Sequence, residues 1–369
     1  MLGSFSGSAP FRIPLLVGLL ATAGFAAESV KIDIAATFPD RQVTGVAVTP
    51  DGRMFVNFPF WSDTHTLSVA EVLPDGSLKA FPDEAWNKKD GDPKSRWVCV
   101  QTVYVDKTGS LWILDPASPK MEGVLPGGAK LVRFDLAANK VAQVISFDDT
   151  VAPSKSYLND VRVEQKTRHA FITESGTGAL ITVNLEDGKA RRLLGNSAAT
   201  RAEPEVKLVV DGFNLVEPKT GLTPQIHADG IALDEDKGLL YFHALTARSL
   251  YRISTTDLLN PKLTDAELGK KLEKVAATSP CDGMIIGRDG ALYLTAFDRN
   301  AIEVWDGKSK KARILVQDDR LQWPDTFAWG PDGALFVTTS QIHRQPKYHG
   351  GVSKQKGPYH VYRLNLPNQ

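Results

Sequence analysis

The sequence is poor in the residues and motifs on which several common chemistries depend. It has two cysteines among 369 residues and contains no C-x-x-C, H-E-x-x-H or P-loop pattern. These absences argue against haem attachment, zinc-protease chemistry and nucleotide binding through a P-loop. The sequence also has no N-x-[ST] sequon, which fits an exported prokaryotic protein.

An excess of charge of one sign is also missing, because 43 basic residues balance 43 acidic ones. This balance excludes the basic footprint of a nucleic-acid-binding protein and an acidic tail. We therefore expect the partner to be a small molecule, with no nucleic acid involved, and the chain to be a monomer.

No hydrophobic run is long enough for a comfortable membrane span. The apolar run "IPLLVGLLATAGFAA" follows Arg12 and ends in small residues, which is typical of a secretory signal cleaved near Ala26 or Ala27. We expect residues 1–27 to be a signal peptide and residues 28–369 to form one secreted or periplasmic domain that is not membrane-bound. A retained N-terminal anchor is the competing interpretation, because the segment before the apolar run carries one positive charge.

The rest of the chain repeats one pattern: an alternating strand, a tight turn that usually contains glycine, and a returning strand rich in β-formers. This is the sequence pattern of a β-hairpin. The six copies are "TGVAVTPDGRMFVNF", "QTVYVDKTGSLWILD", "NDVRVEQKTRHAFITE", "DGIALDEDKGLLYFHA", "DGMIIGRDGALYLT" and "DTFAWGPDGALFVTT", which begin at Thr44, Gln101, Asn159, Asp229, Asp282 and Asp325.

The spacing of these copies, 43 to 70 residues, leaves room for a four-stranded antiparallel sheet in each unit. We predict an all-β fold, a six-bladed β-propeller with four-stranded antiparallel blades. The segment "VKIDIAATF" is expected to supply the outer strand of the sixth blade and to close the ring. One short helical insertion is expected where Thr264 and Glu267 have capping-box spacing, and "LLGNSAATRAEPEVK" is a polar insertion.

Export makes Cys99 and Cys281 candidates for a disulfide. They lie beside the starts of the second and fifth copies, which face each other across a ring of six. Because a disulfide needs Cα atoms within about 7 Å, two buried thiols are favoured over one bridge.

The first residue of each copy is polar in all six cases, which predicts a ring of polar groups around the axis on the strand-entry face. Antiparallel pairing returns the second strand to the same face, so its exit loops should add to the site. Those loops carry Trp61, Asp115, Glu174, Ser175, His243, Thr246, Arg248, Asp298, Arg299, Gln341, His343 and Arg344. The predicted ligand-binding residues are Gln101, Asn159, Asp229, Asp282, Asp325, Trp61, Arg248 and His343.

Each candidate also has a structural interpretation. An aspartate at a strand start often caps backbone amides, His243 and His343 could be satisfied loop histidines, and Trp61 and Trp323 could be core residues between blades.

Several segments together resemble the yellow/major royal jelly protein family in a bacterial-type form. They include "GVAVTPDGRMFVNFPFW", "VQTVYVDKTGSLWILD", "YLNDVRV", "ITESGTGALITVNL", "ADGIAL", "ALTARSLY" and "WPDTFAWGPDGALFVTTSQIHR". The resemblance implies a secreted six-bladed propeller with a ligand-binding channel. Members are associated with dopachrome conversion, and salivary members resemble carriers of biogenic amines.

The family is distantly similar to gluconolactonase and senescence-marker propellers, which hold a divalent metal in the channel. By this resemblance Asn159, Asp229 and Asp282 match metal-ligand positions, while Thr44 stands where a glutamate would be expected and Asp325 could compensate for it. Oxygen ligands favour Ca²⁺ or another hard divalent cation such as Mg²⁺ over zinc.

Three functions follow as hypotheses. The first is binding of a small organic molecule in the channel, with carboxylates facing a cationic amine and Trp61 facing an aromatic ring. The second is a dopachrome-type isomerase in which His243 or Asp229 moves a proton. The third is a divalent-metal-dependent, lactonase-like hydrolase.

Overall fold

The computed structural model describes residue 3 and residues 30–366, and it is a ring of six four-stranded antiparallel sheets. Blade 1 consists of β2 (Gly45–Val48), β3 (Met54–Asn57), β4 (Val69–Val72) and β5 (Leu78–Ala80). Blade 2 consists of β6 (Thr102–Val105), β7 (Leu111–Asp115), β8 (Lys130–Asp135) and β9 (Lys140–Ser146). Blade 3 consists of β10 (Leu158–Glu164), β11 (His169–Glu174), β12 (Ala179–Asn184) and β13 (Ala190–Leu193).

The second half of the ring repeats this plan. Blade 4 consists of β16 (Ala228–Asp234), β17 (Leu239–Ala244), β18 (Ser249–Ser254) and β19 (Glu273–Ala277). Blade 5 consists of β20 (Cys281–Ile286), β21 (Leu292–Ala296), β22 (Ala301–Asp306) and β23 (Lys311–Gln317). Blade 6 consists of β24 (Pro324–Trp329), β25 (Leu335–Thr339), β26 (Tyr359–Asn365) and β1 (Lys31–Phe38). The predicted six-bladed propeller is confirmed.

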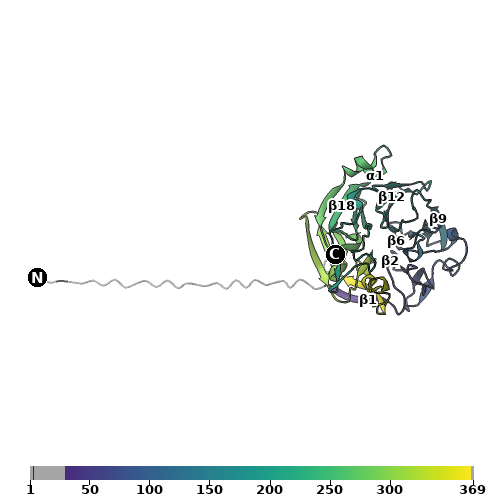
Figure 1. The fold of residues 1–369 in the computed structure, drawn as a ribbon, viewed down its shortest axis with the longest axis horizontal. Coiled ribbons are helices and arrows are strands. Elements are labelled where there is room, and N and C mark those ends of the chain that lie inside the picture. Colours follow the sequence, from purple (N-terminus) through teal and green to yellow (C-terminus); the bar gives the residue numbers. More distant parts are fainter. Residues whose placement is uncertain (1–2, 4–29, 367–369) are drawn as a thin grey trace.

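The ring is closed by strands from both ends of the described chain. Strand β1 pairs antiparallel with β26, from Lys31 opposite Asn365 to Phe38 opposite Tyr359. In Figure 1 the purple β1 accordingly lies beside the yellow C-terminal segment. The predicted role of "VKIDIAATF" as the outer strand of the sixth blade is confirmed, so the sixth sheet depends on residues from both termini.

Two short helices, α1 (Thr255–Leu259) and α2 (Asp265–Gly269), connect β18 and β19 on the outside of blade 4. The predicted capping box is present, because the Thr264 hydroxyl accepts a bond from the Glu267 amide and the Glu267 carboxylate accepts one from the Thr264 amide. The polar insertion after β13 leads into a small hairpin of β14 (Val209–Val210) and β15 (Phe213–Asn214).

The hydrophobic core lies between neighbouring blades. Trp112 of blade 2 packs with Val161 and Ile172 of blade 3, and Phe38 of blade 6 packs with Val56 of blade 1. Each sheet therefore buries its apolar side chains against the next one, and the sheet edges at the central axis are left to line a channel.

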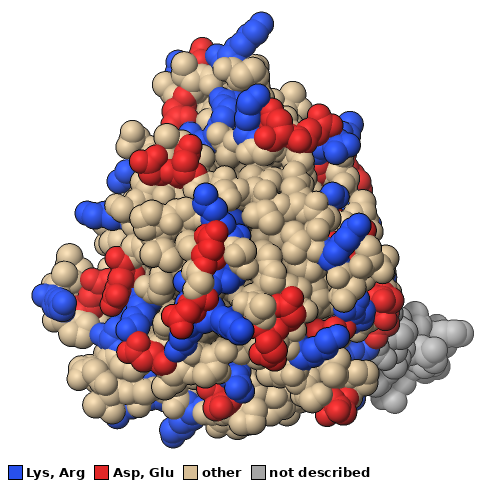
Figure 2. All heavy atoms as spheres, turned by 90° about the vertical axis from the view of Figure 1, so that its right-hand side faces the viewer, with Lys and Arg blue, Asp and Glu red and all other residues tan. Residues whose placement is uncertain are grey.

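Both cysteines are buried free thiols, as the position of their copies on opposite sides of the ring favoured. The predicted signal peptide, residues 1–27, falls almost entirely outside the described residues. Within the described part of the chain, no helix is long and apolar enough to cross a membrane. On the face that Figure 2 shows, basic and acidic side chains are interspersed, in keeping with the balanced charge.

Candidate functional site

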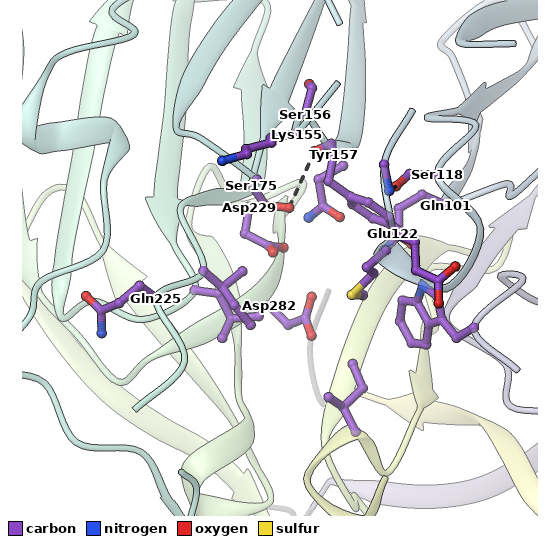
Figure 3. A pocket seen from close by; sticks show the side chains of 18 of the residues that line it. Gln101, Ser118, Glu122, Lys155, Ser156, Tyr157, Ser175, Gln225, Asp229 and Asp282 are labelled. Atoms are coloured by element: carbon purple, nitrogen blue, oxygen red, sulfur yellow. Dashed lines mark hydrogen bonds between the residues drawn. The ribbon is translucent and has the colours of Figure 1, made fainter. Parts of the chain in front are cut away.

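A cavity of about 320 Å³ opens on the strand-entry face of the channel and contains five of the six residues that begin the repeated copies. These are Gln101, Asn159, Asp229, Asp282 and Asp325. Figure 3 shows Gln101, Asp229 and Asp282 reaching into the same space from different blades. The volume is at the lower end of the range for small-molecule sites, about 300–1,000 Å³.

A shared irregularity of the inner strands accompanies four of these residues. In blades 3 to 6 the pairing of the first two strands shifts register at Asn159, Asp229, Asp282 and Asp325, whereas β2 pairs with β3 without a shift. A bulge bends a strand and redirects its side chains, so we attribute the inward direction of these four polar groups to it.

The glycines that follow two of the aspartates have a packing role at these bulges. A Cβ atom on Gly230 would lie 2.6 Å from the carbonyl oxygen of Asp282, and one on Gly283 would lie 2.0 Å from that of Asp325. The Asp-Gly pairs of the sequence are therefore sites where the next inner strand passes too close for any side chain.

Hydroxyl groups hold several strand starts to the neighbouring blade. Thr102 Oγ1 donates to the carbonyl oxygen of Asn159 (2.5 Å), and Thr173 Oγ1 donates to that of Asp229 (2.5 Å). The pattern of copies gives no signal for Thr102, which begins the inner strand β6. For Thr173, a polar residue within the largely apolar second strand β11 is the available signal.

The three aspartates are buried next to one another, and this raises their pKa values. Burial, followed by the charges of Asp282 and Asp325, raises the pKa of Asp229 well above its usual range. Burial raises the pKa of Asp282 to about 6, although the Trp323 indole N–H, 2.7 Å from Asp282 Oδ2, favours its ionised form. Burial and the Asp282 charge also raise the pKa of Asp325.

No basic side chain among the described residues forms an ion pair with Asp229, Asp282 or Asp325, and Asp229 Oδ1 is buried without a hydrogen-bond partner. Other buried carboxylates are neutralised: Asp115 by Lys130 (2.9 Å), Asp160 by Arg162 (2.8 Å) and Glu174 by Arg192 (2.5 Å). The protein thus supplies no counter-charge for these three carboxyl groups, and burial instead favours their protonated forms.

Arg162 spans the channel from blade 3 to blade 5, on the side of the hairpin turns. From blade 3, its Nη1 donates to Asp160 (2.8 Å) and its Nη2 donates to the carbonyl oxygen of Met284 in blade 5 (2.9 Å). Arg162 lines a second cavity of about 770 Å³ on the hairpin-turn face, and the two cavities have no lining residue in common. The carboxylate-lined cavity is therefore reached from the strand-entry face.

Aromatic and apolar side chains form much of the remaining wall. They are Trp61, Met121, Tyr157, Ile226, Leu245, Trp323 and Ile342. Two basic residues also line the cavity and are exposed: Lys155 on a loop and Lys347 in the 3-10 helix Pro346–Tyr348. The inner end of the cavity is therefore acidic and its walls are largely apolar.

Trp323 is a core residue, as the sequence suggested, and it also lines the cavity. It is fully buried and stacks on Phe297 at 4.1 Å, yet it also lines the cavity and donates to Asp282. Its φ of +56° is unusual for a bulky side chain, and such backbone strain concentrates at functional sites.

Three of the predicted site residues do not line the cavity. His243 is fully buried, with Nδ1 2.6 Å from the carbonyl oxygen of Ala244 and Nε2 3.0 Å from Thr278 Oγ1, and burial lowers its pKa to about 4. His343 pairs with Asp211 at 3.1 Å, and Arg248 pairs with Asp298 at 3.2 Å. Because side chains of the fold surround His243, it is placed as a structural residue and not as a proton-transfer group in the cavity.

The predicted metal set of Asn159, Asp229 and Asp282 supplies oxygen donors of the type that Ca²⁺ prefers, but a hydrogen bond from Trp323 competes for Asp282. Trp323 occupies one oxygen of Asp282, and Thr44 accepts a bond from Asn57 Nδ2 (3.0 Å) outside the cavity lining. In the described part of the chain, no three His, Cys, Asp or Glu side chains are arranged to hold a metal ion. The residues present do not fit a metal cage, and we derive no step through a metal.

The fold and the cavity define the class of protein: a six-bladed β-propeller with an acidic, apolar-walled site at one end of its channel. The family model described as Major royal jelly protein matches residues 98–361, and the chain belongs to that family. No curated protein sequence matches the chain.

Solved propellers of several activities share the fold. A gluconolactonase from Xanthomonas campestris is 12% identical over 92% of this chain and 90% of its own, with a TM-score of 0.53. A calcium-binding regucalcin from Agrobacterium tumefaciens is 15% identical over 90% and 94%, with a TM-score of 0.52. Virginiamycin B lyase from Staphylococcus aureus, solved with quinupristin, is 12% identical over 92% and 100%, with a TM-score of 0.50. At these identities the likeness concerns the fold alone.

Proposed function

We propose that this protein binds a small organic cation, an amine with an apolar or aromatic body, in the strand-entry cavity. The observation that carries the proposal is the group of three buried aspartates without a basic partner. Buried charges in proteins are normally paired, as those of Asp115, Asp160 and Glu174 are here. A ligand cation would supply the missing partner.

The walls of the cavity support the proposal that the ligand has an apolar or aromatic body. Trp61 offers an aromatic face, and Met121, Leu245 and Ile342 offer apolar contact. A cation attached to a hydrocarbon or ring would place its charge near the aspartates and its body against these walls. A bare inorganic cation would leave the apolar surface uncovered.

Isomerase activity of the dopachrome type and lactonase activity are less well supported than binding. The histidine considered for proton transfer, His243, has both ring nitrogens engaged away from the cavity. Asp229 is the candidate acid–base residue that does line it. The solved gluconolactonase shares the fold at 12% identity, which carries no activity to this chain.

Thermal unfolding with three ligands of similar shape tests the proposal. 2-Phenylethylamine, 2-phenylethanol and phenylacetate present a cation, a neutral group and an anion on the same ring. We expect the amine alone to raise the midpoint of unfolding, because only a ligand bound to the folded state stabilises it. Stabilisation by phenylacetate, or by none of the three and none of a wider panel of amines, would refute the proposal.

A further inference from the structure

A chain of hydrogen bonds on the wall formed by blades 1 to 3 fixes the orientation of a cavity amide. The indole Nε1 of Trp61 donates to the hydroxyl of Tyr157 (2.8 Å), and that hydroxyl donates to Oε1 of Gln101 (2.8 Å). All three side chains line the cavity. In Figure 3 Gln101 and Tyr157 lie on the same side of the site.

The direction of this chain follows from the chemistry of its first member. An indole N–H can only donate, so the Tyr157 oxygen must accept from Trp61 and its single proton is free to point elsewhere. Two acceptors compete for that proton: Gln101 Oε1 at 2.8 Å and Cys99 Sγ at 3.9 Å. The carbonyl oxygen is closer and is the stronger acceptor, so the proton points to Gln101.

Tyr157 is itself held in place and keeps its proton. Its backbone amide donates to the Glu174 carboxylate (2.8 Å), and its carbonyl oxygen accepts from the Ser175 amide (2.9 Å). Burial raises the pKa of the Tyr157 hydroxyl well above its usual range. The hydroxyl therefore donates at every pH at which the protein would be studied.

The consequence for Gln101 is a fixed amide. With Oε1 accepting from Tyr157, the Nε2 group must point the other way, where no described residue accepts a hydrogen bond from it and where it is not sealed from solvent. Its two N–H donors are therefore accessible from the cavity. Gln225, which also lines the cavity, differs because its Nε2 donates to the carbonyl oxygen of Thr223 (3.0 Å).

Gln101 and the aspartates stand on different sides of the channel. Gln101 precedes β6 in blade 2, and Asp282 is the second residue of β20 in blade 5, which is the opposite blade in a ring of six. The Gln101 wall thus offers amide donors beside the exposed carboxylate of Glu122, and the opposite wall offers the buried carboxyl groups (Figure 3). A ligand that spans the cavity meets both.

We infer that Gln101 is a specificity-determining residue and that the ligand is an amine that also carries a hydrogen-bond-accepting oxygen on its apolar body. Trp61 and Tyr157 act as positioning residues that hold the Gln101 amide with Nε2 toward this oxygen. The inference rests on the proposed function, since it assumes that the cation lies on the aspartates. A donor that the bound ligand covers selects for a ligand that satisfies it, because an analogue without the acceptor leaves the donor unpaired.

Titration calorimetry with 2-phenylethylamine and its three ring-hydroxylated isomers tests this inference. For the wild type, the best hydroxylated isomer should bind about three- to tenfold more tightly than the parent amine, the range for one net hydrogen bond. In Gln101→Met this preference should fall below about twofold while the parent amine still binds. Tyr157→Phe should also reduce the preference, because Gln101 is then free to rotate.

Gln225→Met is the matched control, since it removes a cavity amide whose donor is already engaged, and it should keep the wild-type preference. Equal wild-type affinity for all four amines would overturn this inference and leave the proposed function standing. A preference that survives in Gln101→Met would also overturn it. Failure of the wild type to bind any of these or a wider panel of amines would overturn the proposed function and this inference together.

Discussion

Asp282, the second residue of β20, has its carboxyl group buried at the inner end of the cavity, where the Trp323 indole donates to it. Folding raises the pKa of this acid from 3.8 to about 6. The folded state therefore binds its proton more tightly than the unfolded chain does, and stability is lost as the pH rises through this interval. At neutral pH the ionised Asp282 therefore lowers the stability of the fold. A role in binding would explain why the chain has an aspartate here.

Replacing Asp282 with asparagine should therefore raise the thermal unfolding midpoint of the ligand-free protein at pH 7. Asparagine keeps an acceptor for Trp323 and removes the buried charge. The rise in the pKa of Asp282 corresponds to a gain in folding stability of up to about 3 kcal/mol. The measurement is differential scanning calorimetry. Asp236→Asn, at an aspartate whose side chain is 94% exposed near the opposite cavity, is the control and should change little. A lower midpoint for Asp282→Asn would instead show that the carboxylate stabilises the fold.

The same carboxyl groups predict how binding depends on pH. Protons compete with a ligand cation for the aspartates, so amine affinity should rise with pH through the pKa of Asp282, about 6. A primary amine keeps its charge over this range. For each proton that the ligand displaces, affinity should fall about tenfold for every pH unit below the pKa. Calorimetry in two buffers of different ionisation enthalpy would count the protons released. An affinity independent of pH would mean that the ligand does not displace protons from these groups.

At the scale of single elements, the loops around the cavity are held by ion pairs that the sequence did not distinguish from site residues. Asp115 ends β7 and lies opposite Lys130 of β8, and both side chains are fully buried. Lys130 also donates to the carbonyl oxygens of Pro93 and Gly128, and Asp115 accepts from the amides of Val98 and Cys99. This pair fixes the segment that leads to Gln101.

Lys130→Met should destabilise the protein by about 3–5 kcal/mol, because it leaves the Asp115 carboxylate buried without a counter-charge. Urea unfolding would measure the change. Lys189→Met provides the matched control: Lys189 pairs with Asp187 at the same 2.9 Å, but the two side chains are 84% and 42% exposed. That exposed pair should contribute little to stability, because water screens its charges. Similar losses for the two variants would contradict the role given to Lys130.

The copies in the sequence predicted the hairpins and most of the strand-start residues because both depend on local pattern. The pattern does not say whether a polar side chain faces the channel or a neighbouring blade. Thr44 and Asp229 occupy equivalent positions, yet only Asp229 lies at a register shift and lines the cavity. His243 likewise lies on a second strand, and blade packing buries it. Tyr157 precedes its copy by two residues, so the alignment of copies gave no signal for it.

At the scale of the whole molecule, ring closure by β1 and the packing of blades against one another produce a channel whatever the function. The periodicity of the sequence was therefore sufficient for the fold. The chemistry of the channel depends on which side chains of six distant segments meet at the axis, and on the ion pairs and bulges that direct them. Those features arise from contacts between blades, which a single sequence does not encode in any local pattern.

Metal removal tests the account at this scale. Since Trp323 occupies Asp282 and Thr44 lies outside the cavity lining, we expect little change in the unfolding midpoint after treatment with EDTA or addition of Ca²⁺, Mg²⁺ or Mn²⁺. A cation at a hundredfold over its dissociation constant would stabilise the fold by about 2.7 kcal/mol, which is easily detected. A saturable rise with one cation that is absent in Asp229→Asn would favour the metal-dependent hydrolase instead.

The central claim is that the buried aspartates bind a ligand cation, and titration calorimetry of wild-type protein and Asp282→Asn with the amine that stabilises the wild type most tests it directly. The account predicts saturable one-site binding to the wild type and to the control Asp236→Asn, with affinity reduced at least tenfold in Asp282→Asn, since an ion pair in a buried site is lost. Equal affinity of the wild type and Asp282→Asn, with both proteins folded, would contradict the claim.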